Sequence, residues 1–183
     1  MPNALSKVFA LLIAVVILFV FPIKNELERQ DETSRMYVLN ETIGLVDSVR
    51  NLGYLSPRMY EEFLDELAAT GNIYKVEMEH ASLIYQPVYE YNAVSGTYDA
   101  VEGEYEQTYN STYADVIGEC LFPEADPAAG KNYEMKQGDF FTVRVVNQNK
   151  TMATKIQEIM YGRSIMAEKI FVNYGGMIKD EGN

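Results

Sequence analysis

The longest apolar stretch of the chain lies close to its N-terminus. Residues 8–21 contain no polar side chain, and apolar residues continue on both sides. As a helix, residues 5–23 would measure about 28 Å at about 1.5 Å per residue, which is close to the hydrocarbon thickness of a bilayer. Lys7 and Lys24 lie near the two ends, where long cationic side chains can reach the lipid headgroups. The pattern predicts a helix that contacts membrane lipid through residues 4–23.

A cleaved signal peptide is the alternative to a permanent anchor, because its apolar core has a similar length. The residues that follow the run, Pro22 to Glu26, offer no pair of small residues at which a signal peptidase would cut. We therefore predict an uncleaved anchor in residues 1–24. Lys7 and the α-amino group place positive charge on the short side, while the far side is mixed but acidic. This bias predicts a cytoplasmic N-terminus and an extracytoplasmic domain behind one span.

Residues typical of helices continue beyond the apolar run, from Asn25 to Leu52. Apolar positions in this stretch recur at spacings of three and four, which is one helical face. The predicted buried residues are Met36, Leu39, Ile43, Val46 and Val49. Pro22 lacks a backbone donor, which favours a kink at the end of the anchor. We expect one long helix whose second part, within residues 25–55, is amphipathic and links the anchor to a head domain, residues 56–183.

The head shows further helix patterns. Ser56 and Pro57 are typical of a helix N-cap and first turn. The following helix is expected to bury four side chains: Tyr60, Phe63, Leu64 and Leu67. A short helix is predicted over residues 113–121, and another over residues 151–161. The apolar residues of the last helix are Met152, Ile156, Ile159 and Met160.

Strand patterns alternate between apolar and polar positions over residues 73–85 and 140–146. Pro87 is expected to end the first strand or to mark a sheet edge. A last strand is predicted over residues 165–172, followed by a turn at Tyr174-Gly175-Gly176. Because helices and strands do not alternate regularly, the predicted fold class is α+β. A transmembrane helix continues into an amphipathic helix, which packs with further helices on a small antiparallel sheet.

Residues 88–113 are rich in tyrosine, and Ser95-Gly96 predicts a turn within them, so we expect a hairpin or an irregular excursion. Tyrosine is favoured both in strands and at protein interfaces. Two interpretations remain open, half-buried strand packing and a partner-contact surface. The candidate contact residues are Tyr98, Tyr105 and Tyr109.

Composition narrows the function classes. The 183 residues carry a net charge of −12, which argues against nucleic-acid binding because a phosphate backbone needs Lys or Arg partners. Apolar residues make up 48% of the chain, enough for a packed core. Cys120 is the one cysteine, so no intrachain disulfide can form.

Candidate chemistry is sparse. His80 lies on the apolar side of a predicted strand, which is typical of a structural histidine. Cys120 has no basic neighbour in sequence to lower its pKa, so a buried core thiol is the favoured interpretation. Three glutamates, Glu102, Glu104 and Glu106, could face a calcium ion, but a solvated acidic face is favoured. With no zinc, nucleotide or EF-hand motif in the sequence, we predict a non-enzymatic protein without cofactor or metal.

Three segments carry a family resemblance: Met59–His80 (MYEEFLDELAATGNIYKVEMEH), Lys136–Val145 and Tyr174–Gly176. They resemble uncharacterised single-span pilin-like proteins, of the pseudopilin or TadE-like kind, associated with Tad-type pilus and secretion loci of bacteria. The resemblance implies a structural envelope protein with pilus or secretion subunits as partners. The sequence departs from prepilins, because Ser6-Lys7-Val8 offers no Gly or Ala for cleavage and the apolar run lacks an acid. A permanently anchored component is therefore expected, with a membrane-tethered binding module as the alternative.

Overall fold

The computed structural model describes residues 2–124, 126, 129–167 and 169–179. Residue 1 of the predicted anchor and residues 125, 127, 128, 168 and 180–183 of the predicted head lie outside this part. The described helices are α1 (Pro2–Leu52), α2 (Pro57–Ala68), α3 (Ala114–Leu121) and α4 (Met152–Tyr161). The described strands are β1 (Tyr54–Leu55), β2 (Tyr74–Asn92), β3 (Thr97–Tyr113), β4 (Tyr133–Glu134), β5 (Phe140–Asn147) and β6 (Phe171–Met177). Helices on an antiparallel sheet confirm the predicted α+β class.

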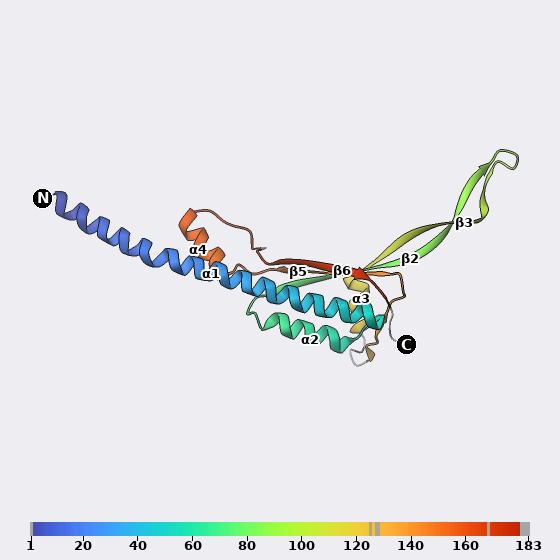
Figure 1. Ribbon diagram of the computed structural model, residues 1–183, viewed down its shortest axis with the longest axis horizontal. Coiled ribbons are helices and arrows are strands. Elements are labelled where there is room, and N and C mark those ends of the chain that lie inside the picture. Colours follow the sequence, from blue (N-terminus) through green and yellow to red (C-terminus); the bar gives the residue numbers. More distant parts are fainter. Residues whose placement is uncertain (1, 125, 127–128, 168, 180–183) are drawn as a thin grey trace.

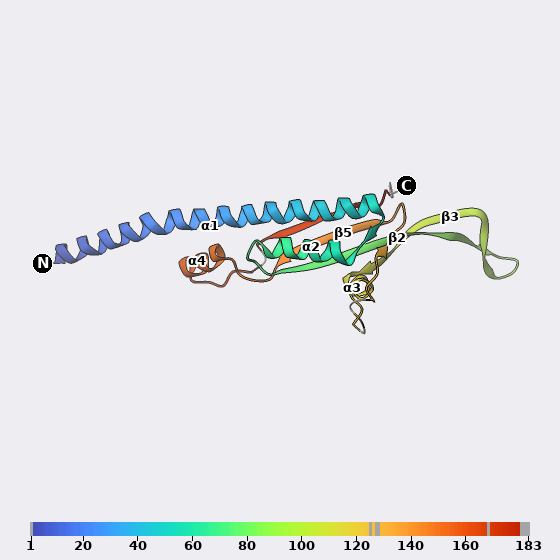
Figure 2. The ribbon, with the colours of Figure 1, turned by 90° about the horizontal axis from the view of Figure 1, so that it is seen from below.

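The long helix α1 runs without interruption through Pro22. Figure 2 shows a gentle curve along α1 rather than a sharp kink, so the span and the amphipathic stretch form one helix, as predicted. Within the described residues, α1 is the one helix long and apolar enough to cross a membrane. Its apolar side chains before Lys24 are uncovered, whereas its C-terminal half packs against the head (Figure 1).

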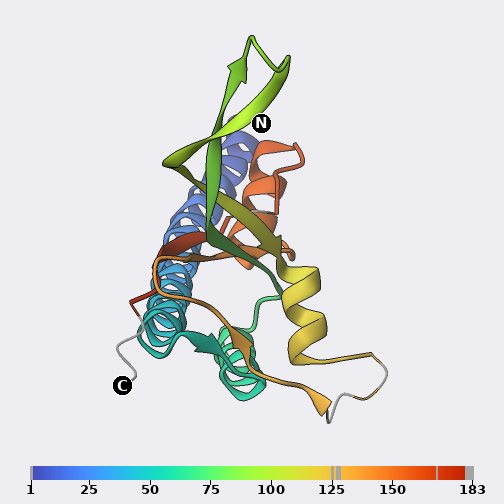
Figure 3. The ribbon, with the colours of Figure 1, turned by 90° about the vertical axis from the view of Figure 1, so that its right-hand side faces the viewer.

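The main sheet has the strand order β3-β2-β5-β6, with every neighbouring pair antiparallel. Its inner face buries Phe141, Val143 and Val145, which are fully covered by the helices. Figure 3 shows α2 and α3 beside α1 on one side of the sheet. Alternation along β5 therefore predicted the inner face correctly. The small β1–β4 ribbon joins Leu55 to Tyr133 beside this core.

The buried face of α1 differs from the predicted one. Val46 and Val49 are buried as expected, but Met36 is exposed. The covered stripe is Val38, Thr42, Leu45, Val46 and Val49. The Thr42 hydroxyl donates to the Val38 carbonyl at 2.7 Å, so a polar residue fits this stripe without an unpaired donor. The way in which α1 packs on the sheet determines which of its side chains are buried. The spacing of apolar residues alone did not distinguish this stripe from the neighbouring one.

Helix α2 begins as predicted, because the Ser56 side chain accepts a hydrogen bond from the Met59 amide at 3.2 Å. Phe63 and Leu67 are buried against α1 and the sheet. The prediction for Leu64 is wrong, since this side chain is exposed. The helix is covered on one side only, and Leu64 lies on the other.

The C-terminal strand also corrects the prediction. Strand β6 begins at Phe171 rather than at residue 165, and Gly175-Gly176 is not a turn but pairs with Thr142 and Phe141 of β5. A Cβ on Gly175 would lie 2.8 Å from the Phe141 carbonyl oxygen. The absence of a side chain at Gly175 and Gly176 lets other groups approach β6 closely, which is one role of glycine within a strand.

Gly176 lies directly under the Arg50 side chain of α1. A Cβ at Gly176 would be 2.6 Å from Arg50 Nε, and that Nε donates to the Met177 carbonyl at 3.0 Å. Arg50 also pairs with Asp47 at 2.7 Å. The missing side chain therefore lets an arginine fasten the end of α1 to β6.

Helix α4 begins at the Thr151 N-cap and ends at Gly162, whose φ of 61° suits glycine. The helix is confirmed, and its fully buried residues are Ala153 and Thr154 rather than the larger apolar ones. Three of these larger residues, Met152, Ile159 and Met160, are exposed. The helix is joined to α1 through polar side chains, which leaves its apolar ones without a cover in the described structure.

Candidate interaction surface

A two-stranded arm projects from the sheet at the end far from the N-terminus (Figures 1 and 3). Strand β5 pairs with β2 only as far as Ala81, and beyond it β2 and β3 pair only with each other. We call residues 82–110 the arm. At about 3.3 Å per residue its β2 side is about 36 Å long. Pro87 lies here, so the strand passes through it at a two-stranded edge where a missing donor is tolerated.

The tip of the arm is a turn made by local hydrogen bonds. Asn92 Oδ1 accepts from the amides of Val94 at 2.9 Å and Ser95 at 3.3 Å. Gly96 follows with a φ of 73°, a region that favours glycine. Asn92 Nδ2 also donates to Asp99 at 2.7 Å. The predicted turn at Ser95-Gly96 and the hairpin around it are confirmed.

Two of the three candidate tyrosines share one face of the arm. Tyr105 pairs with Pro87 and Tyr109 with Leu83, so both point away from the inner face of the sheet. The sequence analysis did not identify two neighbours on this face, Tyr85 and Phe140. The Tyr109 and Phe140 rings meet edge to face at 5.5 Å between centroids. These side chains form a partly exposed aromatic cluster at the base of the arm.

The third candidate, Tyr98, lies apart from that cluster. An irregularity in the pairing after Pro87 separates the two halves of the arm, and Gly103 has a φ of 82° within it. Beyond it Tyr98 pairs with Tyr91, with ring centroids 5.4 Å apart. Tyr98 is 71% exposed, so the structure divides the candidates into a distal pair and a basal cluster.

Counting residues from the predicted turn could have given part of the pairing register of the arm. A turn at Ser95-Gly96 places Tyr91 opposite Tyr98 by simple counting from the tip. Counting fails beyond the irregularity, so Tyr85 could not be assigned to the face of Tyr105 and Tyr109 in this way.

The charge of the arm is of one sign. Residues 82–110 contain five carboxylates and no Lys, Arg or His. The acidic residues are Glu90, Asp99, Glu102, Glu104 and Glu106. The three closely spaced glutamates are solvent-exposed, and no three His, Cys, Asp or Glu side chains among the described residues are placed to hold a metal ion. The arm therefore presents aromatic rings and negative charge to solvent.

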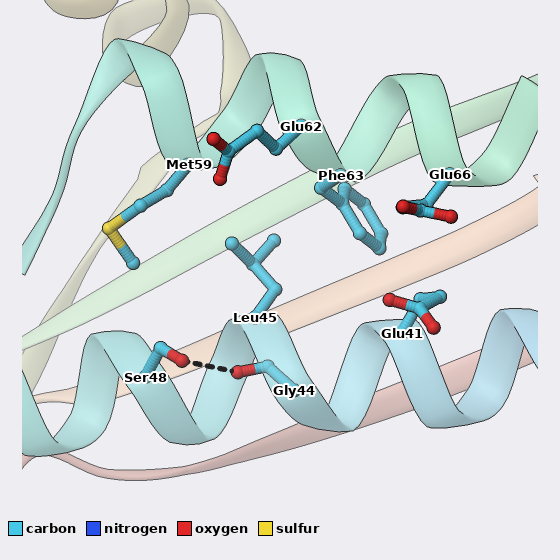
Figure 4. A pocket seen from close by; sticks show the side chains of 8 residues that line it. All are labelled: Glu41, Gly44, Leu45, Ser48, Met59, Glu62, Phe63 and Glu66. Carbon is cyan, nitrogen blue, oxygen red and sulfur yellow. Dashed lines mark hydrogen bonds between the residues drawn. The ribbon is translucent and has the colours of Figure 1, made fainter.

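A groove of about 500 Å³ lies between α1 and α2 (Figure 4). Leu45, Met59 and Phe63 line its apolar part, and glutamates surround it. Glu62 pairs with Arg58 at 2.7 Å, and Glu66 accepts a hydrogen bond from Tyr37. That bond raises the pKa of Tyr37 to about 12, because ionising the phenol would place two negative charges together. The Arg58–Glu62 pair lies within α2, and the Tyr37–Glu66 bond links α1 to α2 beside the groove.

His80 is buried in a closed network. Its Nε2 lies 2.9 Å from Asp139 Oδ2, and its Nδ1 lies 2.9 Å from the Tyr133 hydroxyl. Ser82 Oγ is 3.4 Å from the same Nε2. In a Ser-His-Asp triad the serine and the carboxylate face opposite ring nitrogens, so this arrangement is not a triad. The partnered histidine fits the structural role that the sequence predicted.

Asp139 is the centre of that network. Its carboxylate also accepts from the backbone amides of Leu83 and Lys136, each at 2.8 Å. Burial raises the pKa of Asp139, but these hydrogen bonds outweigh it and hold the pKa below its ordinary value.

Cys120, expected in the core, is only half-buried on α3, with Lys131 and Asn132 carbonyls 4.0 Å from Sγ.

No protein-family model, no curated protein and no solved structure matches this chain. The interpretation of its surfaces therefore rests on their own geometry and charge.

Proposed function

We propose that this protein is a membrane-anchored, non-enzymatic, pilin-like structural component of a surface pilus or secretion apparatus. The observation that supports this most is the continuity of α1. One unbroken helix, Pro2–Leu52, carries an uncovered apolar segment at one end and part of the core of the head at the other. The N-terminus is cytoplasmic in this proposal, and the head lies outside the cytoplasm.

A continuous helix of this kind suits assembly better than simple tethering. Its apolar segment contains no ionisable residue between Lys7 and Lys24, so it can pack on lipid or on the apolar helices of other subunits. Because the same helix is fixed to the sheet through Arg50, contacts made in the membrane orient the head directly. A flexible linker would not transmit that orientation.

Deletion and complementation test the proposal in the source organism. Loss of the gene should abolish the pilus or secretion, and the wild-type chain should restore it. A Leu12→Arg chain should fail, because an arginine near the centre of a span costs about 2.5–3.5 kcal/mol. Leu52→Arg is the matched control, since Leu52 is exposed at the other end of the same helix. Normal pili and secretion in the deletion strain count against a structural role.

The arm favours a second candidate function, a membrane-tethered binding module for a protein, peptide or glycan. Exposed tyrosines supply large contact area at low entropic cost, and the arm holds five carboxylates and no cation. A partner of complementary charge would present Lys or Arg around an apolar surface. The basal cluster around Tyr105 and the distal Tyr98 would be its two contact points.

Site-specific photo-crosslinking in cells tests this second function. A benzophenone amino acid at Tyr105 should give a discrete crosslinked product, which Tyr98→Ala and Tyr109→Ala should weaken. The same probe at Leu64, exposed on α2, is the control position. If Tyr105 yields no product beyond that of Leu64, the arm is not a binding surface.

A further inference from the structure

Helix α4 and the loop after it carry an apolar surface that nothing covers among the described residues. Ile159 is 82% exposed and Met166 is 83% exposed. Three more exposed side chains extend this surface: Met152, Met160 and Tyr161. We call Met152–Tyr161 and residues 162–167 the foot. An apolar patch of this kind, rimmed by polar residues, is typical of an interaction site.

The foot is attached to α1 just beyond the predicted span. Gln157 donates to Glu28, and Glu28 pairs with Lys24 at 3.0 Å. One helical turn further along α1, Thr151 donates to Asp31 at 2.7 Å. Helix α4 therefore runs antiparallel to α1, toward the membrane segment. Figures 1 and 2 show α4 as the part of the head nearest to the N-terminal end.

The height of the foot above the hydrocarbon layer follows from the helix rise. Glu28 lies five residues after Ile23, or about 7.5 Å along the axis. The headgroup layer on each side of a bilayer is about 5–7 Å deep. Gln157 is thus at the outer boundary of this layer, and Ile159 and Tyr161 lie about 3–6 Å closer to the hydrocarbon. The exposed side chains at the C-terminal end of α4, Ile159 and Tyr161, therefore fall within the headgroup layer.

The charge of the foot also fits a lipid surface, although the whole chain is acidic. Residues 150–167 contain three cations and a single carboxylate. Lys155 and Arg163 are exposed. The carboxylate, Glu158, is held by Lys150 at 2.5 Å and by the Ile165 amide at 2.7 Å. Within the foot, the two charged side chains that are exposed, Lys155 and Arg163, are therefore positive, and cationic side chains beside apolar ones favour contact with anionic lipid.

We propose that the foot rests on the bilayer that α1 spans, with Ile159 and Tyr161 inserted among the lipid headgroups. The inference rests on the proposed membrane anchoring. The span and the foot then form two points of membrane contact, which fix the tilt of the head and direct the arm away from the surface. Tyr161 takes the position that tyrosine prefers at a membrane interface.

Depth-dependent fluorescence quenching in the full chain tests this. The chain with Cys120→Ser is reconstituted at low protein density into vesicles of equal parts phosphatidylcholine and phosphatidylglycerol. A single cysteine at Ile159 carries a fluorophore, and spin-labelled lipids are the quenchers. Leu12→Cys in the span and Val94→Cys at the tip of the arm are matched reference positions; Val94 is 98% exposed. Quenching should be several-fold stronger at Ile159 than at Val94.

The three positions separate the possible failures. If Leu12 is quenched while Ile159 behaves like Val94, the foot does not touch lipid and the inference is overturned, although the anchor stands. If Leu12 is not quenched, the anchoring itself is refuted. Shielding of Ile159 that requires high protein density would identify a second copy as the cover, which also overturns the inference. A label at Tyr161 repeats the measurement two residues further along α4, independently of any local disturbance at Ile159.

Discussion

The buried Asp139 carboxylate makes a prediction that can be worked out atom by atom. Oδ1 accepts from the Leu83 amide, and Oδ2 accepts from the Lys136 amide and from His80. In Asp139→Asn one of these oxygens becomes an NH₂ group, which can only donate. Whichever way the amide is turned, it faces one backbone N–H as a second donor. An unpaired buried donor costs about 1–3 kcal/mol.

A change of tautomer at His80 does not remove the cost of the unpaired backbone donor. If the new NH₂ group faces His80, the ring can shift its proton to Nδ1 and donate to Tyr133. The Lys136 amide nevertheless still loses its acceptor. We therefore expect the free energy of unfolding to fall by about 1–3 kcal/mol at neutral pH. Urea unfolding of the full chain in detergent micelles, followed by circular dichroism, measures it. Glu61→Gln, an exposed neutralisation on α2, is the control and should change little.

The pH dependence gives the prediction a second test. The pKa of Asp139 is lower in the folded than in the unfolded chain. Its contribution is therefore complete above the unfolded pKa of about 4 and is lost as the pH falls through the lower folded pKa. The stability gap between wild type and Asp139→Asn should narrow over this acid range. Equal stability at neutral pH, or a gap that does not change with acid, would refute the reasoning.

Two further predictions concern packing, and the same urea measurement checks them. Gly176→Ala should destabilise by about 0.5–1.5 kcal/mol, because its Cβ would displace the Arg50 side chain and break the bond from Nε to the Met177 carbonyl. Gly44 lies in α1, and a Cβ added there would meet nothing within 4 Å, so Gly44→Ala should instead stabilise by about 0.5–1 kcal/mol. Equal effects of the two changes would contradict this account. Phe63→Ala should cost about 3–5 kcal/mol, as expected for a core aromatic. Its neighbour Leu64→Ala should cost under about 1 kcal/mol, and a similar loss for both would show that α2 packs differently.

Local sequence patterns predicted the structure correctly where a single local interaction determines it. The N-cap of Ser56 needs only its own hydroxyl and the Met59 amide, both set by sequence neighbours. The strand over Phe140–Asn147 alternates because one face is covered. The fold class followed from such elements. Which face of a helix is buried depends instead on partners that the spacing does not name, so the predictions for Met36 and Leu64 failed.

The same distinction explains the candidate surfaces. The tyrosines of the arm were visible as a composition, but a face requires a register, and the irregularity after Pro87 changes that register between Tyr98 and Tyr105. The exposed apolar surface of the foot was not predicted from the sequence. Apolar residues recur at helical spacing in Met152–Tyr161, and burial in a head domain is the usual reason for such a pattern. In a chain with a helix long and apolar enough to cross a membrane, lipid is a second apolar environment to consider. Helix α4 is attached to α1 at Glu28, about 7.5 Å beyond Ile23, so the apolar side chains at its C-terminal end can reach such an environment without entering the core.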